Sequence, residues 1–289
     1  MFEQLGLIGC GLMGGSFALA LKQAGLVKRV VGYSKSPTTT ERARQLGAID
    51  VEAPSALLAV SGADIVLIAV PVSASEATFK SIRHMVTPQM LIMDVGSTKG
   101  DVVAAAEIGL REQVGSFVPA HPIAGKEQAG IEHADANLYR DRQVILTPVE
   151  KTLQPQLARA EQVWRAVGSK VVQMTPAAHD AAFAAVSHLP HLLAFALMQS
   201  IAGQDRGAEF LSLAGPGFRD FTRIAASDPS VWRDIFMSNR DELLLQSRAL
   251  VAQLQTLEGL MLAGHGTALQ DAIAQASSTR SQWRMNASD

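Results

Sequence analysis

The feature that most constrains the fold of this chain is a glycine-rich segment that follows a short apolar run near the N-terminus. Residues 5–8 predict a β-strand, a G-x-G-x-x-G pattern follows at once, and an apolar helical pattern begins at Phe17. Such glycines also occur at ordinary turns, but here a strand precedes them and a helix follows. In that setting they allow a tight turn, close approach of the backbone to a pyrophosphate, and close packing of helix on strand. The helix N–H groups then face the phosphates. The residues expected to bind a dinucleotide here are Gly9, Gly11, Leu12, Met13 and Gly14.

The end of the second expected strand bears on which dinucleotide binds. An NAD site of this type places Asp or Glu about 20 residues beyond the glycines, where it binds the ribose 2′-OH. In this chain the strand at residues 29–33 runs into Ser34, Lys35 and Ser36, and no acidic residue occurs before Glu41. Two hydroxyls and an ammonium would donate hydrogen bonds and charge to a 2′-phosphate. The segment therefore favours NADP, with NAD as the alternative, since a polar turn before Pro37 would look the same.

Further apolar runs of strand length alternate with helical patterns up to residue 174. They occupy residues 64–71, 90–95, 116–120, 143–148 and 170–174. Strands that alternate with helices predict βαβ units and a parallel sheet. Ligands of such a sheet bind beyond the carboxyl ends of its strands. Val70 and Pro71 end one of these runs and are expected to contact the cofactor.

Beyond Met174 no strand-like run remains, and the patterns are helical. Residues 191–201 are apolar nearly all round, which predicts a central buried helix. Asp228 before Pro229 predicts a helix start, residues 239–242 resemble a capping box for a further helix, and Gly264 is expected to end that helix. We therefore predict an α/β Rossmann-type dinucleotide-binding domain at residues 1–175, followed by an all-α domain at residues 176–289. The active site is expected in the cleft between them.

Composition excludes several other classes of protein. The 289 residues carry 25 basic and 27 acidic side chains, a formal net charge of −2 that offers no basic surface for nucleic acid or anionic lipid. A single cysteine, Cys10, allows no disulfide within the chain. The first strand begins almost at Met1, so no signal peptide is expected. The longest apolar helical candidate, residues 192–201, is too short to span a membrane. We expect a cytoplasmic protein with no membrane or nucleic-acid partner.

Five motifs together resemble one enzyme family. GxGxxGxS, DVGSTK, HPIAGKEQAG, SHLPH and GPGFRDFTRIAASDPxxW occur in this order and span essentially the whole chain. The set closely resembles the prephenate/arogenate (cyclohexadienyl) dehydrogenase family of tyrosine biosynthesis. The resemblance implies oxidation at ring carbon C4 of prephenate or arogenate by NAD(P)+, with loss of carbon dioxide to leave 4-hydroxyphenylpyruvate or tyrosine. It also implies that the all-α domain is a dimerisation domain and that the chain is a homodimer. The sequence ends soon after the last helical pattern, so we expect no appended ligand-sensing domain.

The resemblance points to specific residues for catalysis. His121 follows a strand and would accept a hydrogen bond from the C4 hydroxyl as hydride leaves; the alternative is a buried histidine satisfied by the backbone. Ser97 would bond the same hydroxyl or orient His121, although a helix N-cap would have the same residue type.

Substrate binding is expected to use residues of the second half. Arg223 would grip a carboxylate with its planar guanidinium. Arg219, one helical turn earlier, is a second candidate that can equally be an exposed surface residue. The resemblance adds His188 and His191, and Trp232 as a pocket aromatic that the partner subunit can supply; helix core is its alternative. The two histidines lack a third ligand nearby, so no metal is expected.

Two other functions compete. A β-hydroxyacid dehydrogenase has a similar domain order but uses a lysine of its second domain, and this chain has no lysine after Lys170. A non-catalytic NADP(H)-binding sensor would explain the glycine-rich segment but would give no reason for His121, Ser97 and Arg223.

Overall fold

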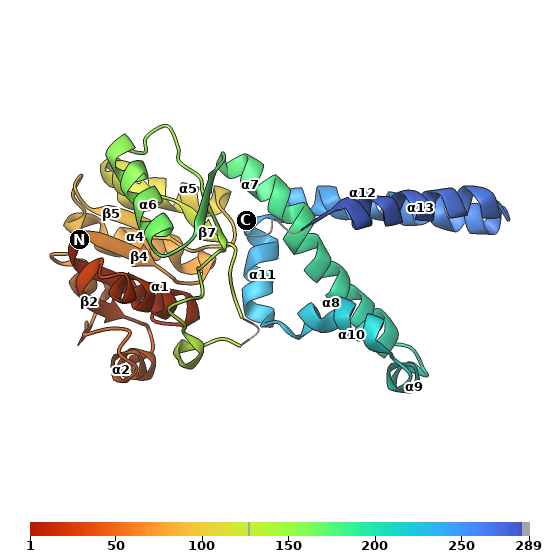
Figure 1. The fold of residues 1–289 in the computed structure, drawn as a ribbon, viewed down its shortest axis with the longest axis horizontal. Coiled ribbons are helices and arrows are strands. Elements are labelled where there is room, and N and C mark those ends of the chain that lie inside the picture. Colours follow the sequence, from red (N-terminus) through yellow and green to blue (C-terminus); the bar gives the residue numbers. More distant parts are fainter. Residues whose placement is uncertain (127, 285–289) are drawn as a thin grey trace. The chain divides into compact units, whose positions relative to one another are not determined.

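A computed structural model describes residues 1–126 and 128–284. Its first half is built on a six-stranded parallel sheet with the strand order β3-β2-β1-β4-β5-β6 (Figure 1). The strands are β1 (Phe2–Ile8), β2 (Val27–Tyr33), β3 (Val51–Glu52), β4 (Ile65–Ile68), β5 (Leu91–Asp94) and β6 (Phe117–Val118). The chain order reverses between β1 and β4, and in doubly wound sheets this switch point is where dinucleotides bind. The predicted Rossmann-type fold is confirmed.

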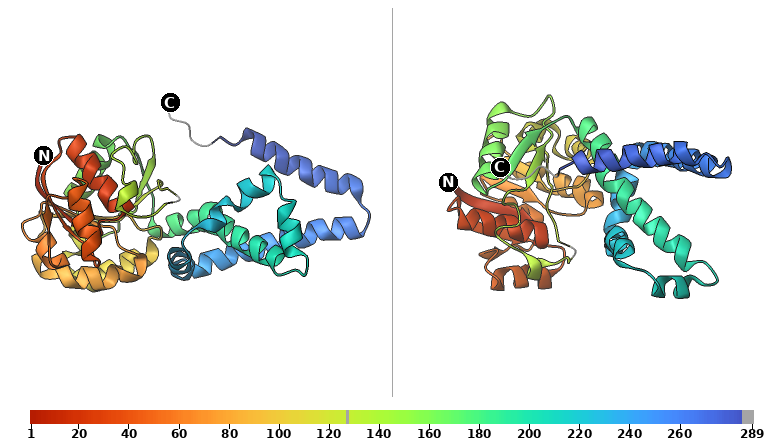
Figure 2. Two further views of the ribbon diagram at one scale, coloured as in Figure 1. Left: turned by 90° about the horizontal axis from the view of Figure 1, so that it is seen from below. Right: turned by 45° about the vertical axis from the view of Figure 1, so that its right-hand side comes forward.

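Helices pack on both faces of this sheet (Figures 1 and 2). Successive strand residues point to opposite faces, so Leu7 joins one apolar core with Phe17 and Trp164, whereas Ile8 joins a second core with Phe79. The first core is covered by α1 and α6, and the second by α3, α4 and α5. The helices of this half are α1 (Leu12–Gln23), α2 (Pro37–Gln45), α3 (Ala56–Val60), α4 (Ser75–Ile82), α5 (Gly100–Leu110) and α6 (Gln154–Ala166). Short 3₁₀ turns occupy η1 (Val72–Ala74), η2 (Arg83–Met85), η3 (Arg111–Ser116) and η4 (Ile131–His133).

The later strands depart from the expected parallel sheet. The run at residues 116–120 divides at Pro119 into β6 and β7 (Ala120–Pro122), and β7 pairs antiparallel with β8 (Gln143–Leu146). Strand β9 (Lys170–Gln173) then pairs parallel with β8, giving a separate three-stranded sheet in the order β7-β8-β9. Proline has no N–H to continue a ladder, so the strand pairing changes there. The prediction of one parallel sheet was wrong for these strands, and the change places His121 in the middle of β7.

A single helical run of 27 residues, Pro176–Ala202, begins the second half. It consists of α7 (Pro176–Phe183), the π-helical turn η5 (Ala184–His188) and α8 (Leu189–Ala202). The prediction that the longest apolar helical candidate covers residues 192–201 was therefore too short, because the π turn carries the helix across Pro190. By length and composition this helix could cross a membrane, and 17% of its most apolar window is buried.

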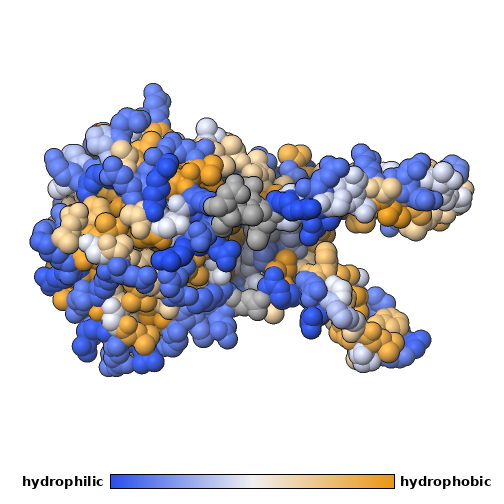
Figure 3. Space-filling model, viewed as in Figure 1, coloured by the Kyte–Doolittle hydropathy of each residue, from blue (hydrophilic) through white to orange (hydrophobic). Residues whose placement is uncertain are grey.

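The predicted burial of residues 191–201 was also wrong for the chain taken alone. Ala194 is the one buried residue that α8 contributes. Apolar side chains gather at the surface over α8 and α9 (Figure 3), and Leu213, just beyond α9, is 78% exposed.

The remaining helices follow after short turns. They are α9 (Gly207–Ser212), α10 (Pro216–Thr222), the 3₁₀ turn η6 (Arg223–Ala226) and α11 (Pro229–Ser238). The Asp228 carboxylate accepts hydrogen bonds from the N–H groups of Ser230 and Val231, which confirms the predicted start of α11. From Asp241 onward the chain forms a second compact unit, with α12 (Arg240–Leu262) and α13 (Gly266–Gln282). Gly264 adopts the left-handed φ of +67° at the end of α12, as predicted.

Candidate functional site

The glycine-rich turn has the backbone geometry that a pyrophosphate requires. Gly9 has a φ of +97°, and a Cβ there would lie 2.2 Å from the Ala69 carbonyl oxygen. At Gly14 a Cβ would lie 2.0 Å from the Gly9 carbonyl oxygen, so α1 can pack this closely on the sheet only with glycine there. A Cβ at Gly11, by contrast, would meet nothing within 4 Å. Gly11 is also the N-cap of α1 and gives no side-chain cap. An open space thus lies against free helix N–H groups, and the residues fit a dinucleotide phosphate.

The segment after β2 lies beside this turn. Ser34 Oγ accepts a hydrogen bond of 2.8 Å from the Cys10 N–H, so the hydroxyl that follows β2 supports the glycine turn directly. Lys35 and Ser36 are exposed, and Ser36 precedes α2 without capping it through its side chain. Cys10 itself is buried, and burial raises the pKa of its thiol to about 11. The thiol is therefore a packed, protonated group.

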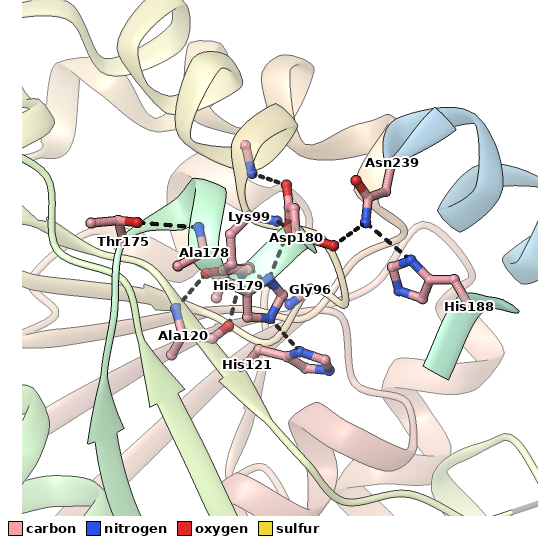
Figure 4. A network of polar contacts seen from close by, with 12 residues as sticks. Gly96, Lys99, Ala120, His121, Thr175, Ala178, His179, Asp180, His188 and Asn239 are labelled. Carbon is pink, nitrogen blue, oxygen red and sulfur yellow. Dashed lines mark hydrogen bonds and ion pairs between the residues drawn. The ribbon is translucent and has the colours of Figure 1, made fainter. Parts of the chain in front are cut away.

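His121 lies at the carboxyl edge of the sheets, on β7, and its ring belongs to a chain of polar contacts (Figure 4). Its Nδ1 atom is 2.8 Å from Nε2 of His179. The Nδ1 atom of His179 is in turn 2.8 Å from Oδ1 of Asp180. Burial is the main cause that lowers the pKa of His121 well below 6.5, and the neighbouring His179 and the Lys99 ammonium lower it further. His121 is thus a neutral imidazole at physiological pH, as the predicted role requires.

Asp180 also holds the start of α5. Its carboxylate oxygens accept hydrogen bonds of 2.8 Å each from the backbone N–H groups of Lys99 and Gly100. Lys99 is the N-cap of α5 and supplies no side-chain cap. The helix N-terminus is therefore capped by a carboxylate of α7, and the alternative in which Ser97 caps this helix is not what the structure shows. Ser97 is half-buried in the loop between β5 and α5.

A buried ion pair supports the same edge. The Lys99 ammonium pairs with the Asp94 carboxylate at the end of β5, and both side chains are almost wholly buried. Lys99 Nζ also donates to the Ala120 carbonyl at 2.8 Å, and the Ala120 N–H donates to Asp94 Oδ1 at 2.9 Å. The pair therefore joins β5 to the strand that carries His121. Removing one partner of such a pair leaves an uncompensated buried charge.

His188 lies in the π turn η5, beside the same network. Asn239 Nδ2 donates to the Asp180 carbonyl at 2.8 Å and lies 3.1 Å from His188 Nδ1. Burial lowers the pKa of His188 to about 4. Its buried Nε2 atom has no hydrogen-bond partner among the described residues. Asn239, predicted to open a capping box, binds this network through its amide nitrogen.

His191 and Trp232 form the neighbouring part of the site. Their rings stack with centroids 3.5 Å apart, and Nδ1 of His191 donates to the Ser187 carbonyl at 2.9 Å. Burial lowers the pKa of His191, and the charge of Arg223 lowers it further, so that guanidinium lies near the ring. Arg219 is exposed and lies 3.5 Å from the carboxylate of its neighbour Asp220. The structure thus places Arg223 near His191, which stacks on Trp232, and both Arg223 and Arg219 are exposed in the single chain.

Val70 and Pro71 follow β4 at the edge where Gly9 approaches Ala69. Both cofactor candidates thus lie at the carboxyl edge, beside the glycine-rich turn. No group of three or more side chains suited to a metal ion occurs within residues 1–126 and 128–284.

Three functional neighbours were missed from the sequence: His179, Asp180 and Asn239. The available signal was the adjacent polar pair His179-Asp180 within an alanine-rich helical pattern. Taken together, the site offers a phosphate-binding turn, a neutral histidine at the strand ends, a buried histidine with an unpaired nitrogen, and a guanidinium beside an aromatic ring. That set can bind a dinucleotide and an anionic substrate and can accept a proton between them.

Comparison with known proteins gives one consistent family. The domain-family model described as prephenate dehydrogenase, nucleotide-binding domain, matches residues 17–173, and the model described as prephenate dehydrogenase, dimerization domain, matches residues 175–275. Cyclohexadienyl dehydrogenase of Zymomonas mobilis is 32% identical over 97% of this chain and 96% of its own length. Prephenate dehydrogenase of Bacillus subtilis is 35% identical over 84% of this chain, and the chain spans 66% of that relative's length.

A solved structure extends the likeness to three dimensions. The crystal structure of prephenate dehydrogenase from A. aeolicus in complex with hydroxyphenyl propionate and NAD+ matches with a TM-score of 0.91 and 35% identity. The match covers 98% of each chain.

Proposed function

This chain belongs to the prephenate dehydrogenase family, and on that premise we propose that it catalyses the NAD(P)-dependent oxidative decarboxylation of prephenate or arogenate in tyrosine biosynthesis. The product is 4-hydroxyphenylpyruvate from prephenate, or tyrosine from arogenate. The observation that carries the proposal is the neutral, half-buried ring of His121 at the carboxyl edge, hydrogen-bonded to His179 through Nδ1. A bound nicotinamide dinucleotide supplies the acceptor for hydride.

His121 acts on the hydroxyl of the substrate ring. As hydride leaves C4, the hydroxyl proton becomes acidic, and a neutral imidazole nitrogen accepts it. Loss of carbon dioxide then returns an electron pair to the ring, and the same proton goes back to the oxygen of the new phenol. Ser97, half-buried in the loop after β5, donates to or accepts from the same hydroxyl.

Substrate anchoring uses the residues around α8 and α11. Arg223 grips a carboxylate by two parallel hydrogen bonds. The Nε2–H of His188, for which residues 1–126 and 128–284 offer no partner, donates to a substrate oxygen and so satisfies a buried donor that would otherwise cost about 1–3 kcal/mol. Trp232, stacked on His191, forms an apolar wall for the ring. Arg219 is exposed and is the second candidate for binding the carboxylate, in place of Arg223.

The dinucleotide lies on the glycine-rich turn. Gly9, Gly11, Leu12, Met13 and Gly14 hold its pyrophosphate, with Val70 and Pro71 beside it. Ser34, Lys35 and Ser36 meet the adenosine ribose, and the absence of an acidic side chain there supports NADP over NAD. The Asp or Glu typical of NAD sites would repel a 2′-phosphate.

We further propose a homodimer in the cytoplasm. The exposed apolar side chains of α8 to α11 and the match to a dimerization-domain model support the dimer. The Rossmann-type domain is proposed to end at residue 175 and the dimerisation domain to cover 176–289.

This function is tested by measuring the reduction of the nicotinamide through the absorbance of the reduced cofactor. Each of prephenate and arogenate is mixed with NAD+ or NADP+, and a β-hydroxyacid is included as a control substrate. Reduction with a cyclohexadienyl substrate and none with the β-hydroxyacid is expected. Reduction with the β-hydroxyacid alone would favour that dehydrogenase class, and no reduction in any mixture would favour a non-catalytic sensor.

A further inference from the structure

A chain of hydrogen bonds runs from the backbone of α5 to the ring of His121 (Figure 4). It begins at the N–H groups of Lys99 and Gly100, which donate to the Asp180 carboxylate at 2.8 Å. It continues from Asp180 through His179 to His121, with both of the intervening contacts at 2.8 Å. His179 is fully buried, so water does not compete for these contacts. Nothing in the proposed chemistry so far uses Asp180 or His179.

The direction of each bond follows from the groups at its ends. The hydrogen bonds from His179, Gly100 and Lys99 lower the pKa of Asp180, although its burial raises it, so the carboxylate is ionised and can only accept. Nδ1 of His179 must therefore carry a proton and donate it. In a neutral His179 ring this is the single proton, so Nε2 of His179 is an acceptor and Nδ1 of His121 is the donor to it.

We propose that His179 and Asp180 are positioning residues of the reaction: they hold the single proton of His121 on Nδ1 and so leave its Nε2 as the acceptor for the substrate hydroxyl. The inference rests on the proposed function for its chemical meaning. A ring with the other tautomer would present an N–H to the hydroxyl and could not take its proton.

The arrangement also suits the state after proton transfer. When Nε2 takes the hydroxyl proton, His121 becomes an imidazolium, and Nδ1–H still donates to His179. No ring has to turn. The new positive charge lies two hydrogen bonds from an ionised carboxylate, and that carboxylate is fixed by two backbone N–H groups at a helix N-terminus.

A second branch leaves from the same residue. The backbone carbonyl of Asp180 accepts from Asn239 Nδ2, so the amide nitrogen is the atom that faces His188 Nδ1. Nδ1 of His188 therefore accepts, and its proton lies on Nε2, the buried atom that finds no partner in the described part of the chain. Asp180 thus fixes the tautomers of two histidines: His121 is left with an acceptor at Nε2, and His188 with a donor at Nε2.

The experiment reads the tautomer directly. Two-bond ¹H–¹⁵N correlation spectra are recorded on the full-length enzyme labelled with ¹⁵N at its histidine rings, without cofactor or substrate. They report which ring nitrogen of His121 carries the proton. The His121→Asn variant assigns its signals among the 7 histidines. The proposal requires a proton on Nδ1 in the wild-type enzyme. A proton on Nε2 of wild-type His121 would overturn it, whether or not any variant folds.

His179→Phe tests the link to His179. Phenylalanine keeps a flat ring for the stack on Phe183, whose centroid is 4.4 Å from that of His179, but it offers no acceptor. A buried Nδ1–H without a partner is unfavourable, so the proton of His121 should move to Nε2. We expect kcat to fall on the order of 10²-fold, with the substrate KM changed little. An unchanged tautomer and kcat would overturn the proposal.

Phe183→Leu is the matched control, because it removes the aromatic contact with both histidine rings and keeps every hydrogen bond. Its His121 tautomer should match the wild type. A shift of the tautomer in this variant as large as in His179→Phe would assign the effect to packing and overturn the proposal. The tautomer measurement needs no turnover, so its outcome is separable from that of the activity assay: an enzyme that turns over neither substrate contradicts the proposed function alone.

Discussion

Nδ1 of His121 lies 2.8 Å from Nε2 of His179, although 58 residues separate them in the chain. One histidine comes from a strand of the small sheet and the other from the first helix of the second half. The contact therefore links the group proposed to accept a proton to the part of the chain proposed to bind the substrate. A displacement of α7 would change the orientation of the His121 ring.

The first prediction concerns cofactor choice. Ser34→Asp keeps an acceptor for the Cys10 N–H but places a carboxylate where a 2′-phosphate would lie. The ratio of kcat/KM for NADP+ over NAD+ should fall by about tenfold or more, since hydrogen bonds to charged groups are worth about 1.5–3 kcal/mol. Ser34→Ala is the control and should weaken both cofactors without reversing their order. A wild type that prefers NAD+, or a ratio that ignores the aspartate, would refute the proposed role of this segment.

The second prediction concerns the substrate carboxylate. Arg223→Ala should raise the substrate KM steeply with a smaller effect on kcat, because a carboxylate is gripped in the ground state and the transition state alike. The loss should correspond to about 1.5–3 kcal/mol. Arg219→Ala, exposed and one helical turn away, should leave KM within about twofold, as is usual for surface charges. An unchanged KM in Arg223→Ala with a raised KM in Arg219→Ala would exchange their roles.

The third prediction concerns pH. Burial lowers the pKa of His121 well below 6.5, and the neutral ring is the active form. As pH falls through 6.5 the base is still present, so kcat/KM should stay level there and decline only at lower pH. An acid limb centred at 6.5 or above would contradict the lowered pKa of His121 in the free enzyme.

The protonation of His188 should affect the stability of the fold. Burial lowers the pKa of His188 to about 4 in the folded chain, from an ordinary value of 6.5, so between these pH values the unfolded state binds more protons. Stability should therefore fall as pH decreases from 6.5 to 4. Denaturant unfolding of His188→Gln over this range should show a shallower pH dependence than the wild type.

The fourth prediction concerns assembly. Apolar side chains of α8 to α11 are exposed in the single chain, and we propose that a second copy of the chain packs on them. Light scattering at micromolar concentration should give twice the chain mass of 30.7 kDa, and dissociation should expose an extensive apolar surface. A stable monomer under these conditions would rule out the proposed dimer.

The sequence predicted those parts of the fold that depend on local pattern. A strand, the glycines and a helix follow one another directly, so the phosphate-binding turn could be recognised without knowing the rest of the structure. His121 was recognisable for a similar reason, because a polar residue directly after an apolar strand pattern is expected near the carboxyl edge of a sheet, although the structure places it in the middle of the short strand β7. The predicted role of Arg223 came from the family motif rather than from a local sequence pattern.

The parts that could not be predicted depend on contacts between distant segments. In the sequence, His179 and Asp180 have the pattern of polar positions on an exposed helical face. Only the packing of α7 against the start of α5 shows that they are buried and what they bind. Asn239 has the local pattern of a helix cap, and only the position of His188 shows where its amide binds. The exposure of α8 in the single chain could not be predicted for a different reason. The sequence of an apolar helix is the same whether its own chain or a partner covers it.

The central claim is that a neutral His121 accepts the hydroxyl proton as hydride leaves, and His121→Asn tests it most directly. Asparagine is polar and of similar reach but does not act as a base near neutral pH. Kinetics of the variant and the wild type should be compared with the preferred substrate at saturating cofactor, together with equilibrium binding of that substrate. The account predicts a fall in kcat on the order of 10² to 10⁴-fold with substrate affinity nearly retained. A variant with near-normal kcat would contradict it and remove His121 from the mechanism.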